Sequence, residues 1–242
     1  MPTPLVDVTI MSIYITNNQR MPLPKRMARA TPDMNATLQK VSAALEARGG
    51  HLYLSDLFRS YEMQLQSHLD WKTGKKQAFS PAPGGSLHEA GRALDLDLES
   101  LGVSLKDFWP IGREHGLFPI ISAPTAGVSE SWHFDCRGSH DIVYQHYKDG
   151  KGNNFSKPYV AMAASAILAI GVQVDKFGSK QKEAAVQSAL IRLGHDIGNM
   201  DGGIGNRTKQ ALTAAGVPLA DPATMLTALE AQLAARFPAE FQ

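Results

Sequence analysis

SLHEAGRALD, at residues 86–95, and ESWHFD, at residues 130–135, are the most informative stretches of this 242-residue chain. From Ala93 to Leu98, leucines alternate with other residues, which is the two-residue period of a strand with one face in a core. Asp95 and Asp97 share the opposite face. Gly91 permits a tight turn just before this strand. Residues 131–135 are the next candidate strand, so both stretches are expected to bring polar side chains onto a sheet.

Helical patterns and further strand signals surround these stretches. From Met34, apolar residues recur at helical spacing until Gly49 and Gly50 end the pattern. Residues 51–58 favour a strand, and helices are expected at 61–71 and 105–116. The elements follow no regular βαβ rhythm, which favours an α+β class. We therefore expect a catalytic domain over residues 34–147, with a small central antiparallel sheet flanked by helices.

The two ends of the chain differ from this central part. Residues 1–33 contain prolines and little periodicity, which predicts an extended lead-in. Residues 148–157, KDGKGNNFSK, have the polar, glycine-rich composition of a linker. Residues 158–242 predict a small all-α domain. Its helices are expected at residues 158–170, 181–193, 206–215 and 223–236.

Composition excludes several classes of function. The apolar share of 43% and charged share of 19% are those of a globular protein. A net charge of +1 gives no basic field for nucleic acid. Cys136 is the single cysteine, so an internal disulfide and a four-cysteine zinc site are excluded, and a buried apolar role is expected for it. Any metal must be held by histidines and carboxylates.

The sequence also gives expectations about location. Residues 1–20 lack the pattern of a signal peptide, and residues 159–174 are too short an apolar stretch to span a membrane comfortably. We expect a protein made in the cytoplasm, with no membrane span. If its substrate is the cell wall, a holin, a phage or a secretion machinery must deliver it to the periplasm or wall.

The histidines and carboxylates of the two stretches have the chemistry of a metal hydrolase. Zinc hydrolases use three nitrogen or oxygen ligands and leave one position open for water. His88, Asp95 and His133 would supply them, with Asp97 as the rival of Asp95. A carboxylate that is not a ligand must act as base, and Glu130 is the candidate. This assignment requires Glu130 to lie on the loop before the strand that holds His133, because residues three apart in a strand face opposite sides.

The pattern Ser-x-His-x-x-Gly-x-Ala-x-Asp, followed by Glu-x-Trp-His, resembles the zinc D-alanyl-D-alanine carboxypeptidases and dipeptidases of the lysostaphin/D-Ala-D-Ala peptidase group. The resemblance covers residues 34–147. It implies one Zn²⁺ held by His88, Asp95 and His133, with Glu130 as the catalytic base. It also implies that Arg59 and Ser86 bind substrate, although Arg59 could instead be a structural ion-pair partner.

A second resemblance lies near the C-terminus. Val186-Gln187-x-x-Leu190-x-x-Leu193-Gly194 and the segment 201–212, DGGIGNRTKQAL, are similar to the three-helix peptidoglycan-binding domain. The aromatic-Gln ending of that domain is absent here, where residues 213–216 read TAAG. This departure bears on affinity for the wall more than on the fold.

Together, these features predict a monomeric zinc metallopeptidase that hydrolyses amide bonds in peptidoglycan stem peptides, in the manner of an endolysin or a delivered wall hydrolase. Its partners would be the stem peptides and the glycan wall. Glu130, where phage-type endopeptidases often have aspartate, favours cleavage near D-alanine, but carboxypeptidase and endopeptidase activity both stay open. The alternatives are a cytoplasmic D-Ala-D-Ala dipeptidase and a zinc-containing wall-binding protein without turnover.

Overall fold

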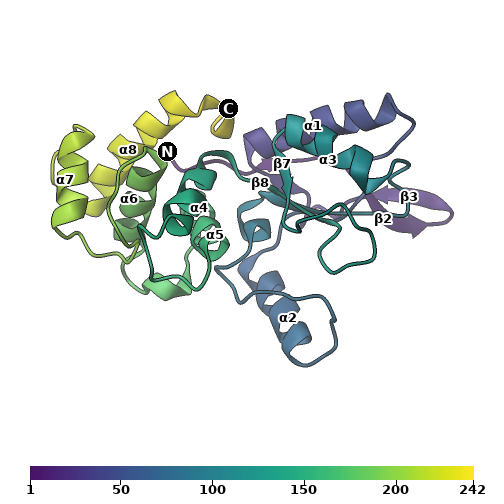
Figure 1. Cartoon of the computed structure of the whole chain (residues 1–242), viewed down its shortest axis with the longest axis horizontal. Coiled ribbons are helices and arrows are strands. Elements are labelled where there is room, and N and C mark those ends of the chain that lie inside the picture. The colour runs from purple at the N-terminus through teal and green to yellow at the C-terminus, as the bar shows by residue number, and fades with distance from the viewer. The chain divides into compact units, whose positions relative to one another are not determined.

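A six-stranded sheet organises the first half of the chain in the computed structural model, which describes residues 1–242 (Figure 1). The strand order is β3-β2-β5-β6-β8-β7. A separate pair, β1 (Val6–Asp7) and β4 (Arg29–Ala30), forms a two-stranded sheet. The six strands are β2 (Met11–Thr16), β3 (Gln19–Pro22), β5 (Leu54–Asp56), β6 (Ala93–Leu96), β7 (Leu117–Pro119) and β8 (His133–Cys136).

The N-terminal segment, expected as an extended lead-in, contributes strands to the sheet, and one of its strand pairs is parallel where an antiparallel sheet was expected. β2 and β3 form a hairpin, and β2 runs parallel to β5 through the pair Ser12 and Leu54. The two residues of the hairpin loop, Asn17 and Asn18, have φ values of 51° and 60°. Asparagine tolerates this left-handed region, which two-residue hairpin loops require. The sheet is therefore mixed, and its edge is built by residues that precede the predicted domain.

The helices of this part lie on both sides of the sheet. Figure 1 shows α1 (Pro32–Glu46) and α3 (Leu105–Glu114) on one side and α2 (Tyr61–Lys72) on the other. The core includes Leu94 and Phe134 from the sheet, which are 0% and 1% exposed. Because side chains alternate along a strand, the neighbours of these two residues point to the opposite face. The polar candidates are therefore directed toward the side of α2.

A buried ion pair joins the start of β6 to the start of α1. Both terminal nitrogens of Arg92 donate to Asp33, over 2.8 and 3.0 Å, and Nη1 also donates to the carbonyl of Cys136. Arg92 is fully buried, and a bidentate geometry is what makes such a buried guanidinium tolerable. Cys136 is a buried residue of the core, and its thiol lies 3.9 Å from a carboxylate oxygen of Asp33.

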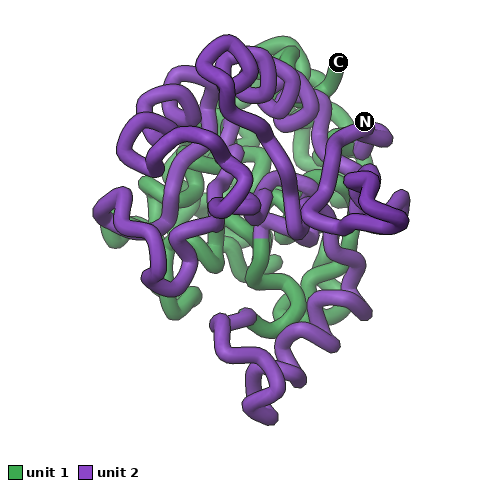
Figure 2. Tube along the Cα trace, turned by 90° about the vertical axis from the view of Figure 1, so that its right-hand side faces the viewer, with its two compact units in different colours: residues 1–4, 81–86, 139–242 green, residues 5–80, 87–138 purple.

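The chain divides into two compact units, coloured separately in Figure 2. One holds Leu5–Ser80 and Leu87–Gly138, with the sheets and α1–α3. The other holds Met1–Pro4, Pro81–Ser86 and Ser139–Gln242, with the longer helices α4–α8 and no strand. These are α4 (Asp141–Lys148), α5 (Pro158–Ala169), α6 (Gln181–Arg192), α7 (Asn206–Ala214) and α8 (Pro222–Arg236).

The second unit contains the four predicted helices as α5–α8, each within two residues of its expected ends. α4 was not predicted, and it places residues 141–147 with the helical unit. No helix of the chain is both long and apolar enough to cross a bilayer.

One buried glutamine holds the glycine-rich turn that precedes α7. The side-chain oxygen of Gln187 accepts from the backbone N–H groups of Asp201 and Gly202, over 2.8 and 2.7 Å. Its amide nitrogen donates to the carbonyl of Gly203 and to a carboxylate oxygen of Asp201. Gln187 is 1% exposed. The DGG sequence therefore forms a turn in which Gln187 binds three backbone groups and the Asp201 carboxylate accepts from the backbone N–H of Gly203.

Gln187→Leu should lower the free energy of unfolding by about 2–4 kcal/mol, because two backbone donors lose their acceptor at a buried position. Urea unfolding followed by circular dichroism measures this change. The matched control is Gln210→Leu, at an exposed position on α7, where a change within about 0.5 kcal/mol is expected. Equal unfolding midpoints for the two variants would show that the turn does not depend on Gln187.

Candidate metal centre

Three neighbouring strands bring the polar candidates into one row. In the antiparallel registers, Asp56 of β5 lies opposite Asp95 of β6, and Asp95 lies opposite His133 of β8. Directly opposed residues of an antiparallel pair project their side chains on the same face. The strand register alone therefore places two carboxylates and an imidazole side by side.

The fourth member, His88, comes from a short 3-10 turn, η1 (Leu87–Ala90), just before β6. Gly91 follows it with φ of +63°, and a Cβ there would lie 2.9 Å from Leu5 Cδ2 and 3.0 Å from Ala30 Cα. The turn thus requires glycine, as the sequence predicted. His88 Nδ1 donates to the carbonyl of Leu57 over 2.8 Å, so its Nε2 faces the row, 3.4 Å from Asp95 Oδ1.

Both ring nitrogens of His133 face carboxylates. Nδ1 lies 3.0 Å from Asp95 Oδ1, and Nε2 lies 2.9 Å from Asp135 Oδ1. His133 and Asp135 are two residues apart in β8, so the strand places them on one face. This arrangement points Nδ1 of His133 toward Asp95 and Nε2 toward Asp135. In metal-ligating histidines, the ring nitrogen that does not bind the metal usually has such a hydrogen-bond partner.

His88, Asp95 and His133 form a group that could hold a metal ion. One ligand atom from each of them lies within 4.8 Å of the others, and the group is largely buried. Two nitrogens and one oxygen are a donor set that fits a divalent transition metal. The rival carboxylate, Asp97, is held elsewhere, since it faces Arg20 at 3.5 Å and accepts from the backbone N–H groups of Glu99 and Ser100.

The charged residues of the group shift one another's pKa values. Burial opposes ionisation of Asp95, but His88 and His133 outweigh it and hold the pKa of Asp95 well below its ordinary value. Burial also opposes protonation of His133, yet Asp135 and Asp95 raise the pKa of that imidazole to about 10. His133 is therefore a positively charged imidazolium at neutral pH. An ion that binds through Nδ1 must displace the proton on that nitrogen.

Glu130 lies where the sequence required it, in the turn that precedes β8. Its carbonyl accepts from the backbone N–H of His133 over 3.1 Å, and its φ of 67° is in the left-handed region. Such a conformation is unfavourable for a residue with a Cβ and persists where the surroundings impose it. Burial raises the pKa of Glu130; the charge of His133 opposes this rise, and the charge of Asp95 adds to it. The turn therefore holds a half-buried carboxyl near the metal group.

Arg59 forms ion pairs with Asp56 and Asp95. Its Nε donates to Asp56 over 2.6 Å, Nη1 donates to Gln64 of α2 over 3.1 Å, and Nη2 faces Asp95 Oδ2 at 3.4 Å. Its backbone N–H donates to the carbonyl of His88. Burial lowers the pKa of Arg59, but Asp56 and Asp95 outweigh it and raise that pKa. The guanidinium thus fixes the Asp95 oxygen that does not face the histidines.

Ser86 is buried but is not among the residues that supply ligand atoms. Its segment, Pro81–Ser86, belongs to the compact unit of helices α4–α8. His140 and His146, the other histidines close to His133 in sequence, also lie in that unit. Their ring nitrogens contact the Ser165 hydroxyl and the Gly198 carbonyl.

Sequence reasoning missed three charged residues of this site. Asp56 contacts Arg59, and Asp135 contacts His133. Lys76 interacts electrostatically with Arg59, Asp95 and Glu130. The signal for Asp135 was present, because it follows His133 by two residues in a predicted strand. The loop of Lys76 has no pattern that assigns its position.

Replacement of Asp135 by asparagine should weaken metal binding by about 10–100-fold without abolishing it, because His133 keeps a neighbour but loses the charge that orients its ring. Competition with a chromogenic chelator measures the affinity. Asp107→Asn, at an exposed position in the first turn of α3, is the control. An unchanged affinity in Asp135→Asn would mean that Asp135 does not support the metal ligand.

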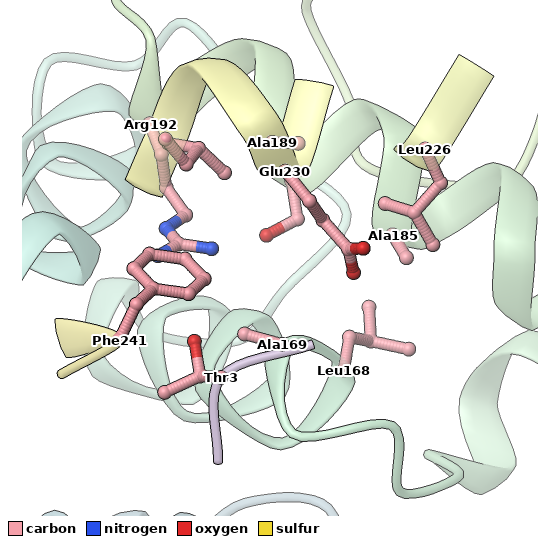
Figure 3. Close-up of a pocket in the computed structure, with 11 residues that line it drawn as sticks. Thr3, Leu168, Ala169, Ala185, Ala189, Arg192, Leu226, Glu230 and Phe241 are labelled. Carbon is pink, nitrogen blue, oxygen red and sulfur yellow. The ribbon is translucent and has the colours of Figure 1, made fainter. Parts of the chain in front are cut away.

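A small cavity in the helical unit is shown in Figure 3. Its lining includes Thr3, Leu168, Arg192, Glu230 and Phe241. The volume of about 10 Å³ is no more than one water molecule needs. The cavity is therefore too small for a peptide or sugar, and the candidate chemistry lies in the sheet-containing unit.

No protein-family model matches this chain, and no curated protein matches it either.

Proposed function

We propose that the protein is a zinc-dependent peptidase that hydrolyses amide bonds in the stem peptides of peptidoglycan. The observation that carries this proposal is the convergence of His88, Asp95 and His133 within 4.8 Å, with Glu130 in the adjoining turn. A group with three ligands and a nearby carboxylate that does not belong to it has the composition of a hydrolytic centre.

Zinc is the metal favoured by these residues. Two imidazoles and one carboxylate form a catalytic zinc set, which leaves a fourth position of the ion for water. Both imidazoles are already oriented, His88 by the carbonyl of Leu57 and His133 by Asp135. Bound zinc would lower the pKa of water from about 15.7 to about 7 and so supply a nucleophile at neutral pH.

The residues around the ligands would transfer the protons and polarise the substrate. Glu130 accepts the proton of the attacking water and delivers it to the nitrogen of the departing amine, which restores the carboxylate. Its raised pKa makes Glu130 a stronger base for the first of these transfers. Arg59 holds Asp95 in place, and its remaining N–H groups are available to polarise the carbonyl of the scissile amide.

The substrate class rests on the resemblance of the two motifs to the D-alanyl-D-alanine peptidases. The likeness of residues 186–212 to a peptidoglycan-binding domain supports action on the assembled wall. We therefore propose an endolysin-like or delivered wall hydrolase. A dipeptidase acting on free D-Ala-D-Ala is the alternative within the same chemistry.

Incubation of purified sacculi with zinc-loaded protein tests the proposal. New amino groups and altered stem peptides should appear in chromatograms of the released fragments, and a chelator should prevent both. Free D-Ala-D-Ala serves as a second substrate in the same assay. Cleavage of the dipeptide alone would favour the dipeptidase, and cleavage of neither would refute the proposed function.

A further inference from the structure

A chain of hydrogen bonds links the metal group to a lysine on the loop after α2. Arg59, which faces Asp95, donates to Gln64, and Gln64 donates to the Ser80 hydroxyl over 3.0 Å. Ser80 donates to the Ser67 hydroxyl over 3.0 Å, and Ser67 accepts from Lys76 Nζ over 2.9 Å. Gln64 and Ser80 are fully buried, so this chain is a fixed part of the unit.

The loop itself is tied to α2 at several points. The backbone N–H of Lys76 donates to the carbonyl of Asp70 over 3.0 Å. His68 Nδ1 donates to the carbonyl of Ser80, and the rings of Trp71 and Phe79 pack edge to face at 4.8 Å. Lys76 is therefore not a freely moving surface lysine but an ammonium group held in a defined place.

The charges around this ammonium are those of the candidate centre. Arg59, Asp95, Asp56 and Glu130 are all within electrostatic range of Lys76. Burial and the charge of Arg59 lower the pKa of Lys76, and the carboxylates oppose this effect. Lys76 is half-buried, and one of its three N–H groups is used by Ser67. Two donors thus remain for a ligand at the site.

We propose that Lys76 is a specificity-determining residue that binds a carboxylate of the peptide substrate, and that the preferred substrates are peptides with a free carboxylate close to the scissile amide. This inference rests on the proposed peptidase function. In this proposal Lys76, and not Arg59, has the main role in binding the substrate carboxylate.

The contacts of the two cations support this division of roles. Arg59 is 7% exposed, and each of its three nitrogens already faces Asp56, Gln64 or Asp95. Lys76 has no ion pair with a protein carboxylate at contact distance, since its only side-chain partner is a hydroxyl. A substrate carboxylate would therefore gain a charge-assisted bond from Lys76 without breaking an existing ion pair.

Kinetics with two matched substrates test this proposal. One is the soluble stem-peptide fraction from sacculi with its carboxylates free, and the other is the same fraction with them converted to methyl amides. Wild-type protein should prefer the free form. Lys76→Met should raise KM for the free form by about 10–100-fold, the range of a charge-assisted hydrogen bond, and leave kcat and the KM for the blocked form nearly unchanged. Lys76→Arg should retain part of the preference.

Lys75→Met is the matched control, because Lys75 is the exposed neighbour, and its KM values should equal those of wild type. A structural effect of Lys76→Met would change both substrates equally and would overturn the proposal, as would an unchanged preference for the free form. In either case the peptidase function stands. Failure of the zinc-loaded wild type to cleave both substrates would instead overturn the peptidase function, and the role of Lys76 with it.

Discussion

Glu130→Gln should lower kcat for stem-peptide hydrolysis by a factor of about 100 to 10,000 and leave bound zinc unchanged. The amide has nearly the shape of the carboxyl but cannot accept and return a proton, and general base catalysis is worth a factor of this size. Because Glu130 supplies none of the atoms of the metal group, the ligands should be unaffected.

Activity and metal content must be measured on the same sample, by amine release and by elemental analysis. Glu99→Gln, at an exposed position, is the charge-matched control. Glu130→Gly adds a second readout: glycine relieves the left-handed backbone at φ of 67°, so this variant should lose activity without losing stability. Full activity in Glu130→Gln would remove Glu130 from the mechanism.

The sequence predicted the grouping of His88, Asp95 and His133 better than it predicted the sheet. His88, Asp95 and Glu130 stand next to strong local signals: Gly91 in an obligatory left-handed turn, an alternating strand, and a loop that ends at His133. Those signals are local, so no knowledge of distant contacts was needed. The pairing of β2 with β5 is non-local, and only Asn17 and Asn18 marked the hairpin that leads to it.

The charged neighbours of the ligands were harder to predict for the same reason. The resemblance predicts that Arg59 binds substrate, but it does not predict its ion pairs, which depend on the register that sets Asp56 opposite Asp95. Lys76 is linked to Arg59 only because Gln64, Ser67 and Ser80 form a hydrogen-bonded chain between α2 and its following loop. No periodicity in the sequence predicts these hydrogen bonds.

Asp95→Asn should weaken zinc binding at least about a hundredfold, more than the loss of a supporting residue such as Asp135 costs. Asp95 is the only carboxylate of the metal group, and its Oδ1 faces both imidazoles. Asp97→Asn is the decisive control, because the two aspartates share a face in the sequence pattern. The Asp97 oxygen that accepts from the backbone of Glu99 and Ser100 has a counterpart in asparagine, so this variant should bind zinc like wild type.

Thermal unfolding separates the two variants. At a free zinc concentration of 100 times the wild-type Kd, bound zinc stabilises wild type and Asp97→Asn by about 2.7 kcal/mol. The same concentration should stabilise Asp95→Asn by no more than about 0.4 kcal/mol, since its Kd would equal or exceed the zinc concentration. Equal stabilisation of Asp95→Asn and wild type would exclude Asp95 as a ligand, and loss of stabilisation in Asp97→Asn alone would move the metal to the other aspartate.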